Sequence, residues 1–352
     1  MKDFTFIFWE LKRRNPYSVH GGYPCIGYPQ ADKLVPAFER VGANFQIIEF
    51  CDYSSLGLQP GEDQKDPFKT LGSKIESDNV LIEWDGITSH RDYQNIFKWN
   101  KKLYVIPHFA GAIAGFDSLG IEQQIRKEVT DNSIKVIFEL QWERDFWKNL
   151  ECNKFIIMNP PTRTGTQFDK LETRKALGIS TKYAIICWGN YEFKSYEEMI
   201  PWIAEWKDTS LLFVGSGNEE AMRLIAKAHN IERNVFFSRH GISDVDADLW
   251  FSASDLCTLP RRCFGSSTPT HVIGQGKCMI TQSYPAYIEL EKISGIVTSS
   301  DLKKTTRELL LDEEKRKVFE LKSQEYARNN SFEQYAIRIG KLMNLNYQEG
   351  KK

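Results

Sequence analysis

Residues 254–281 read SDLCTLPRRCFGSSTPTHVIGQGKCMIT and give the clearest indication of the fold. Their pattern predicts a strand, a loop, a short helix and a second strand. The first apolar run has the length of a strand, and Pro260 ends it because proline cannot donate to a strand ladder. Thr268 and Pro269 resemble an N-cap followed by a proline in the first helical position. Gly276 is typical of a helix end.

This arrangement would bring the N-terminus of a helix to one edge of a parallel sheet. Free N–H groups and hydroxyls at such a helix end favour an anion, and phosphate is the usual one. Arg261 and Arg262 lie in the preceding loop, and their guanidinium groups suit phosphate oxygens. The same pattern also describes an ordinary strand–helix connection with solvated arginines, so both interpretations stand at this point.

The composition excludes several classes of protein. The 352 residues include 46 basic and 47 acidic side chains, so no basic excess indicates a nucleic-acid partner. No apolar run reaches the roughly 18 residues of a membrane span, and the chain opens on a strand-like run at 4–9 without a signal-peptide pattern. Seven scattered cysteines argue against a disulfide framework or a zinc site. We therefore expect a cytoplasmic protein of about two domains.

Short apolar runs alternate with helical patterns along the chain. A strand over 4–9, a glycine-bearing loop, a helix over 31–41 and a strand over 45–50 favour a parallel sheet covered by helices. Further strands are expected at 80–84, 103–106, 134–138 and 155–158, and from Tyr183, Leu211, Val235, Leu256, Cys278 and Gly295 onward. The pattern predicts an α/β fold of two Rossmann-like domains facing a cleft.

The clearest interruption of this pattern is residues 159–170, NPPTRTGTQFDK. Two prolines and a glycine disfavour regular structure there. We place the domain boundary in this stretch, between an N-terminal domain over 1–162 and a C-terminal domain over 163–330. Residues 331–352 are expected to form a final helix, with Ser331 as its cap.

The second half carries a recognisable succession of motifs. They are 185–189 (IICWG) followed by Lys194, 214–217 (VGSG), 234–237 (NVFF), 254–260 (SDLCTLP), and 264–265 with 276–280. The succession resembles the strands, phosphate-binding lysine and donor loop in the C-terminal domain of the GT-B glycosyltransferases, most closely glycosyltransferase family four. In the first half the similarity rests on Gly21-Gly22, Gly42, His108 and Asn159-Pro160.

The resemblance implies a hexosyltransferase of polysaccharide biosynthesis. It would move a sugar from a nucleotide-sugar donor to a glycan or lipid-linked acceptor, with retention of configuration and without a metal. The nucleotide sugar is then a substrate, and no cofactor is required. The resemblance also implies an acceptor-side N-terminal domain, a C-terminal domain that binds the nucleotide sugar, and a final helix that packs back toward the N-terminal domain. The alternatives are a non-catalytic GT-B subunit that binds glycan or nucleotide, and a GT-B sugar-nucleotide epimerase.

The expected site residues combine what the resemblance implies with the charge of the leaving group. Fixed positive charges and N–H groups stabilise the negative charge that develops on a departing diphosphate. His108 follows a predicted inner strand, where it would bond a hydroxyl of the transferred sugar or pack in the core. The full set comprises His108 and Lys194 as catalytic residues; Gly189, Lys194, Gly215, His240, Arg261, Arg262, Gly265, Ser266, Ser267 and Thr268 for the donor; and Gly22 and Asp85 on the acceptor side.

The sequence departs from the family pattern at three places. The family's arginine before the lysine is replaced by the stretch 189–192, and its two glutamates fall near Arg262 and at Thr270 or His271. These replacements leave the donor sugar open and are the reason for keeping a non-catalytic alternative.

Two charged stretches raise further alternatives. The stretch 244–248, DVDAD, has the Asp-x-Asp spacing that binds a divalent metal in the other large glycosyltransferase fold. Acidic residues are also ordinary in the first turn of a helix, and we therefore expect no metal there. Lys12, Arg13 and Arg14 would suit an anionic surface, so a peripheral position at the inner membrane face is an alternative to a purely cytoplasmic one.

Overall fold

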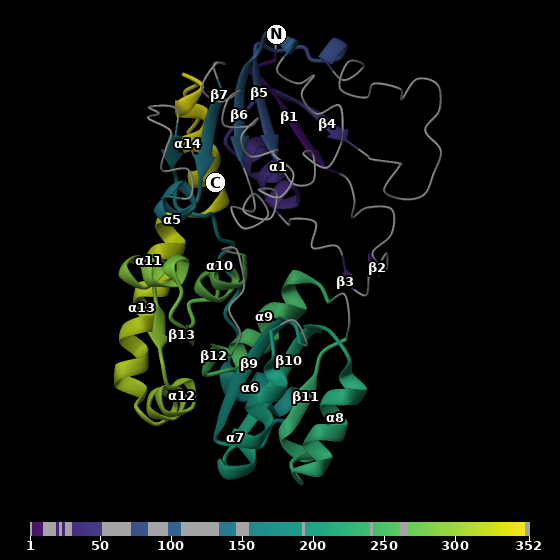
Figure 1. Cartoon of the computed structure of the whole chain (residues 1–352), viewed down its shortest axis with the longest axis vertical. Coiled ribbons are helices and arrows are strands. Elements are labelled where there is room, and N and C mark those ends of the chain that lie inside the picture. The colour runs from purple at the N-terminus through teal and green to yellow at the C-terminus, as the bar shows by residue number, and fades with distance from the viewer. Residues whose placement is uncertain are drawn as a thin grey trace. The chain divides into compact units, whose positions relative to one another are not determined.

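The computed structural model of the protein describes residues 2–9, 19–20, 23–24, 30–50, 72–83, 98–106, 134–145, 155–191, 194–239, 242–260 and 267–348. The chain divides into two compact units, one formed by Met1–Asn159 with Phe332–Lys352 and the other by Pro160–Ser331 (Figure 1). Within the described residues each unit contains a six-stranded parallel sheet with flanking helices. The predicted α/β fold of two Rossmann-like domains is therefore confirmed.

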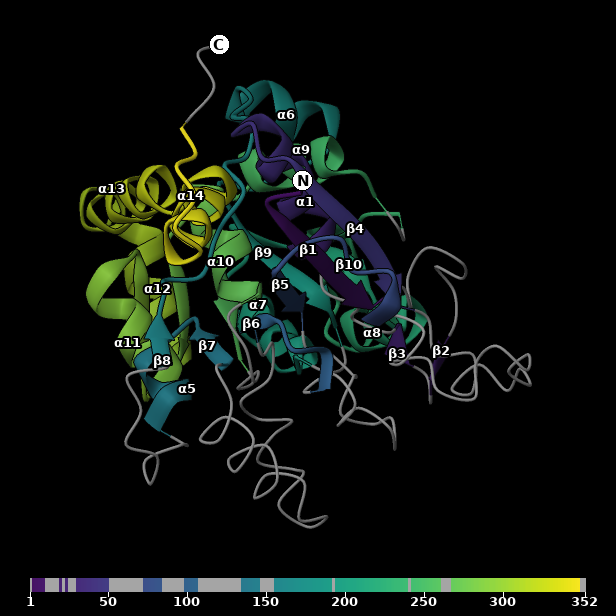
Figure 2. The same ribbon diagram turned by 90° about the horizontal axis from the view of Figure 1, so that it is seen from above.

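The sheet of the first unit has the strand order β4-β1-β5-β6-β7-β8. Its strands are β1 (Phe4–Trp9), β4 (Phe45–Phe50), β5 (Asn79–Glu83), β6 (Lys102–Ile106), β7 (Ile134–Phe138) and β8 (Phe155–Ile157). The unit also contains the antiparallel pair β2 (Val19–His20) and β3 (Tyr23–Pro24), and the helices α1 (Gln30–Arg40), α5 (Gln141–Asp145) and α14 (Phe332–Leu342). β1 lies between β4 and β5 (Figure 2).

The core of the first unit includes side chains from both ends of the chain. In and just after α1 the buried residues recur at helical spacing, at Leu34, Ala37, Phe38 and Val41. They belong to the same core as Phe4 on β1, whose ring centroid lies 4.8 Å from that of Phe38. Tyr335, Ala336 and Ile339 of α14 complete this core, so the last helix is an integral part of the first unit.

The sheet of the second unit has the strand order β11-β10-β9-β12-β13-β14. Its strands are β9 (Tyr183–Asn190), β10 (Thr209–Ser216), β11 (Val235–Phe237), β12 (Leu256–Leu259), β13 (Met279–Gln282) and β14 (Ile296–Ser299). Numbered along the chain, this is the order 3-2-1-4-5-6 of a nucleotide-binding doubly wound sheet. The order reverses between β9 and β12, which are neighbours. In such sheets the ligand binds outside the carboxyl ends of the strands at this reversal.

Five helices of the second unit begin with the same kind of N-cap hydrogen bond. Asp169, Asn218, Ser243, Asp301 and Asp312 each accept the backbone N–H of the residue three positions later. The helices are α6 (Lys170–Ala176), η5 (Tyr196–Met199), α7 (Ile200–Glu205), α8 (Glu219–Ala228), η6 (Glu232–Asn234), α9 (Asp244–Ala253), α10 (Ser267–Gly274), α11 (Pro285–Ile293), α12 (Leu302–Leu311) and α13 (Glu313–Asn329). None of the described helices is long and apolar enough to cross a membrane.

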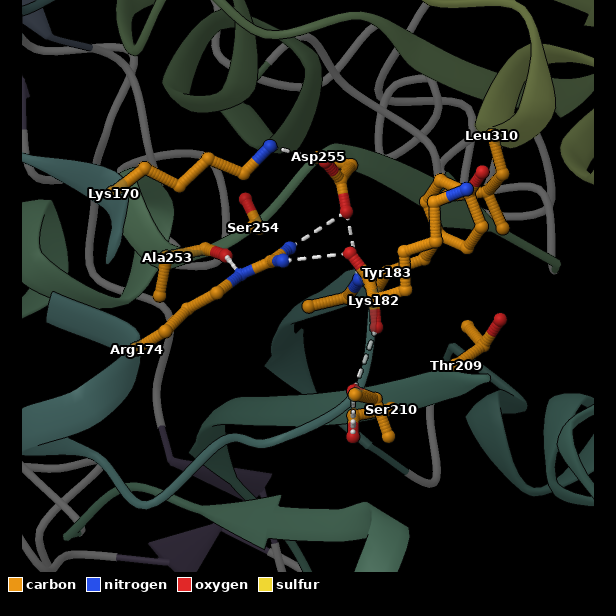
Figure 3. Close-up of polar contacts among 12 residues, drawn as sticks. Lys170, Arg174, Lys182, Tyr183, Thr209, Ser210, Ala253, Ser254, Asp255 and Leu310 are labelled. Carbon is orange, nitrogen blue, oxygen red and sulfur yellow. Dashed lines mark hydrogen bonds and ion pairs between the residues drawn. The ribbon is translucent and has the colours of Figure 1, made fainter. Parts of the chain in front are cut away.

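A buried ion-pair cluster holds the amino-terminal edge of this second sheet (Figure 3). Asp255 immediately precedes β12, and its carboxylate accepts hydrogen bonds from the guanidinium of Arg174, at 2.7 Å, from the backbone N–H of Ala184, at 2.7 Å, and from the Lys170 ammonium. Burial raises the pKa of Asp255, but the charges of Lys170 and Arg174 outweigh it and hold the pKa below its usual value. The carboxylate therefore stays ionised and ties α6 to the starts of β9 and β12.

Candidate functional site

The site begins at the turn that follows β9. The backbone N–H of Lys194 donates to the carbonyl of Asn190 at 3.2 Å, and the hydroxyl of Tyr196 donates to the carbonyl of Trp188 at 3.0 Å. Tyr191 and Tyr196 are fully buried, and the backbone N–H of Tyr191 donates to the carbonyl of Ser216 on β10. These bonds fix the turn against the ends of two strands, and the turn carries Lys194 at the carboxyl edge of the sheet.

Lys194 contacts the first turn of α10. Its ammonium donates a hydrogen bond to the Thr268 hydroxyl, and each residue is only 7% exposed. Lys194 follows β9, whereas Thr268 follows β12, so this bond spans the reversal in strand order. The predicted donor residues Lys194 and Thr268 are therefore brought together, although 74 positions separate them in the sequence. A buried ammonium beside a helix N-terminus provides positive charge and N–H groups for an anion.

Two of the predicted glycines leave room for this contact. Gly189 has a φ of +102°, and a Cβ placed there would lie 2.6 Å from the Lys194 ammonium nitrogen. Its register partner Gly215 has a φ of +143°, and a Cβ there would lie 2.3 Å from the Gly189 carbonyl oxygen. Any side chain at either position would displace the lysine or separate the two strand ends, which explains why both positions are glycine.

The Gly189→Ala variant is expected to lose stability and also affinity for the nucleoside diphosphate that the resemblance implies, because its new methyl group displaces the Lys194 ammonium. The matched control is Gly178→Ala, because Gly178 has a similar positive φ of +71° but nothing lies within 4 Å of its added Cβ. Both variants should lose about 1–2 kcal/mol to backbone strain. Thermal melts and calorimetric titration of both proteins check this, and equal affinities in the two variants would contradict it.

Two of the three departures from the pattern of the resembled family fall on described residues, and Arg262 does not. Tyr191 occupies the region of the missing arginine and lies in the core, with its ring centroid 5.2 Å from that of Phe213. Burial raises the pKa of Tyr191. A Cβ at Gly217 would lie 2.7 Å from this ring, so the second glycine of the VGSG motif accommodates the tyrosine. His271, at one of the glutamate positions, lies in α10 with its ring centroid 5.4 Å from that of Trp188.

The start of α10 corrects one local prediction. Thr268 was expected as the N-cap, but the helix begins at Ser267, and Thr268 lies in its first turn. Within this turn the Thr268 hydroxyl accepts a hydrogen bond from the Lys194 ammonium, which gives the side chain a role in the site.

Each of the three acidic residues of the Asp-x-Asp stretch has a partner in the protein, and two of them share Arg163. Ser243 caps α9, and its hydroxyl also donates to the Asp246 carboxylate at 2.9 Å. Asp248 is fully buried and accepts both terminal nitrogens of Arg163, whereas Asp244 lies 3.8 Å from the Arg163 Nε. In the described part of the chain no three His, Cys, Asp or Glu side chains group in a way that would hold a metal. The stretch therefore acts as a helix start with a buried ion pair.

Thiol chemistry is unfavourable beside Lys194. Cys257 on β12 is fully buried, and burial raises the pKa of its thiol to about 12, although the Lys194 charge opposes this shift. The thiol therefore stays protonated at neutral pH, and a thiol is a poor nucleophile. The arrangement of described residues is suited to holding an anion at the carboxyl edge of the sheet.

Much of the predicted site falls outside the described residues. Those positions are Gly22, Asp85, His108, His240, Arg261, Arg262, Gly265 and Ser266, whereas Ser267 is described as the first residue of α10. The aromatic support from Tyr191 and Tyr196 was not predicted. Its only signal in the sequence is the presence of two tyrosines beside the lysine, which does not distinguish core from surface.

Comparison with known proteins identifies the fold. Neither the protein-family models nor the curated proteins give a match. Among solved structures, HepE of Anabaena in complex with UDP is similar with a TM-score of 0.72 at 13% identity, over 98% of this chain and 100% of that chain. Sucrose-phosphate synthase of Thermosynechococcus elongatus gives 0.66 at 14%, over 97% and 98%.

WaaG, a glycosyltransferase involved in lipopolysaccharide biosynthesis, gives a TM-score of 0.61 at 13% identity, over 97% of this chain and 99% of that chain. These structures are GT-B glycosyltransferases, and the likeness extends over both units. The chain therefore has the GT-B fold. At such low identity the likeness concerns the fold alone, and the assignment to family four stays a prediction.

Proposed function

We propose that the protein is a glycosyltransferase that binds the diphosphate of a nucleotide-sugar donor at the carboxyl edge of its second sheet. The observation that carries this proposal is the bond between the Lys194 ammonium and Thr268 across the reversal in strand order. This point of a doubly wound sheet is where nucleotides bind. The glycines at 189 and 215 leave room for the lysine, and the first turn of α10 supplies N–H groups beside it.

The chemistry of the proposed reaction is the departure of a nucleoside diphosphate from the sugar. Negative charge grows on the diphosphate oxygens in the transition state, and a fixed ammonium with helix N–H groups stabilises it without reorganisation. Lys194 holds this position in the proposal, and Arg261 and Arg262 add charge from the loop before α10. His108 would bond the transferred sugar, His240 would border the base, and Gly22 and Asp85 would line the acceptor side.

The transferred group is proposed to be a hexose, moved with retention to a glycan or lipid-linked acceptor. In a retaining transfer the departing phosphate can take the acceptor proton, so no protein base is required. Support for a nucleotide donor comes from HepE, whose solved structures hold UDP alone and UDP with glucose. A cytoplasmic enzyme, with or without peripheral contact to the inner membrane face, is consistent with this acceptor class.

A panel of nucleotide sugars tests the proposal. The purified protein is incubated with each donor, and release of nucleoside diphosphate and of free sugar is followed over time. Slow hydrolysis of one donor, abolished in the Lys194→Ala variant, is the expected result. Binding of a nucleoside diphosphate without turnover of any donor or transfer to any glycan would favour the non-catalytic subunit. Interconversion of the sugar while it remains on the nucleotide would favour the epimerase.

Turnover is expected to be independent of metal, because fixed cations take the place of a divalent ion at the diphosphate. The rate of donor turnover is measured before and after exhaustive EDTA treatment and dialysis. An unchanged rate is expected. Loss of activity that is restored by manganese or magnesium would show that a cation completes the site.

A further inference from the structure

The middle and the C-terminal end of helix α10 are hydrogen-bonded to the irregular segment 162–168. The Thr162 hydroxyl donates to the carbonyl of Thr270 at 2.6 Å, and the backbone N–H of Gly165 donates to the carbonyl of Gly274 at 3.1 Å. A Cβ at Gly274 would lie 2.2 Å from both the Arg163 carbonyl oxygen and the Thr162 hydroxyl. The segment therefore lies in direct contact with one face of the helix.

The same segment satisfies the end of α10. The last carbonyl groups of a helix have no partners within the helix. Here the carbonyl of Gly274 accepts the Gly165 N–H, and the carbonyl of Gln275 accepts the Gln167 side-chain amide at 3.1 Å. Segment 162–168, which belongs to the second unit, thus serves as a cap for α10.

One buried carboxylate holds this segment and the helix together. Asp248 of α9 is fully buried and accepts two guanidinium donors from Arg163, the Thr166 backbone N–H at 2.9 Å and the Gln275 side-chain amide at 2.6 Å. Arg163 and Thr166 belong to the segment, whereas Gln275 follows the last residue of α10. Charge-assisted bonds of this kind are short and strong and impose a defined geometry.

The opposite end of α10 carries Thr268. The helix has eight residues, so it is about 12 Å long at 1.5 Å per residue. A helix of about two turns is stiff over that length, so a change in how Gln275 is held would shift the first turn as well. The position of the Thr268 hydroxyl relative to the Lys194 ammonium therefore depends on how the far end is held.

We propose that Asp248 is a positioning residue of the donor site. Through Gln275 and segment 162–168 it fixes α10, and α10 in turn places Thr268 and its first-turn N–H groups around the diphosphate next to Lys194. This inference rests on the proposed function, because it assigns a role in binding that same diphosphate. It also gives the Asp-x-Asp stretch a task that involves no metal.

The test uses two variants that preserve shape and remove one bond each. Gln275→Met removes the amide that joins the helix to Asp248, and Thr162→Val removes the hydroxyl bond to Thr270. UDP, GDP and ADP are titrated into the wild-type protein by calorimetry, and the nucleotide that binds best is used for all variants. We expect each variant to bind this nucleotide roughly five- to tenfold more weakly than the wild type. This is the effect of losing about one hydrogen bond that positions the helix.

The control is Asp208→Asn, which disrupts another Arg–Asp pair in the same unit, formed with Arg307 at 2.9 and 3.2 Å. It is expected to leave the affinity unchanged. Gln275→Met is also made in the Lys194→Ala protein. If Gln275 had a structural role alone, Gln275→Met would weaken the affinity of Lys194→Ala as much as it weakens the affinity of the wild type. If Gln275 acts through the Lys194–Thr268 contact, Gln275→Met weakens the affinity of Lys194→Ala less than about twofold further. Affinities within twofold of wild type for both variants would overturn the positioning role. Absence of nucleotide binding by the wild-type protein would instead overturn the proposed function, and the positioning role with it.

Discussion

Replacing Lys194 with alanine is expected to weaken nucleoside-diphosphate binding by tens of fold or more. Lys194 brings a full positive charge to a position that is only 7% exposed, beside the first turn of α10. A hydrogen bond to a charged group contributes about 1.5–3 kcal/mol, which corresponds to roughly a 10- to 150-fold change in the dissociation constant. Calorimetric titration of the best-binding nucleoside diphosphate measures the loss directly.

A matched control separates the position of Lys194 from the general effect of removing a lysine. Lys303 lies in the same unit, where its ammonium pairs with Glu205 at 2.6 Å on the surface. Lys303→Ala removes the same charge from the protein and is expected to bind the nucleotide as wild type does. The circular dichroism spectrum of both variants should match that of the wild type. Equal affinity in Lys194→Ala and Lys303→Ala would remove Lys194 from the donor site.

Loss of Asp255 is expected to cause the largest change in stability. The Asp255→Ala variant leaves the Arg174 guanidinium buried without its carboxylate (Figure 3), and the Ala184 N–H also loses its acceptor. Removal of one partner from a buried ion pair costs about 3–5 kcal/mol. For a unit of this size each kcal/mol shifts the melting temperature by about 2–4 °C, so a decrease of roughly 6–20 °C is expected by scanning calorimetry.

The exposed pair between Asp208 and Arg307 provides the comparison. Their side chains are 38% and 28% exposed, and Asp208→Ala is expected to cost less than about 1 kcal/mol because solvent screens the pair. Similar melting temperatures for the two variants would show that the Asp255 cluster does not hold the edge of the sheet.

Acid-induced unfolding should reveal how much the Asp255 cluster stabilises the fold. Because the folded state holds the pKa of Asp255 below its unfolded value, its ionised form stabilises the fold at neutral pH, and this contribution is lost as the pH falls below about 4 toward the folded pKa. In the Asp255→Asn variant this part of the acid-induced loss should be absent.

The fold could be predicted from the sequence because its signal is local. Apolar runs of strand length lie at 4–9, 45–50 and 134–138, and the structure has β1, β4 and β7 over the same residues. The helix around Pro36 also forms, because four apolar residues at helical spacing bury one face and outweigh the proline. The start of α10 was placed two residues too late, at 269 after an expected Thr268 cap, whereas the helix begins at Ser267.

The candidate site could be predicted only in part. Gly189, Lys194, Gly215 and Thr268 belong to motifs that flank strands, and the strand order brings them to one edge. The contacts of Asp248 could not be predicted, because Arg163 and Gln275 lie 85 and 27 positions away and only the folded chain unites them. The pairing of Arg174 with Asp255, which lie 81 positions apart, could not be predicted for the same reason.

In the proposed site the donor diphosphate lies between Lys194 and the first turn of α10. A crystal structure of the protein with the nucleoside diphosphate that binds best would locate it. We expect diphosphate oxygens within hydrogen-bond distance of the Lys194 ammonium and of the Thr268 hydroxyl or backbone N–H. A diphosphate bound in the first unit, or at the amino-terminal edge of the second sheet near Asp255, would contradict this expectation.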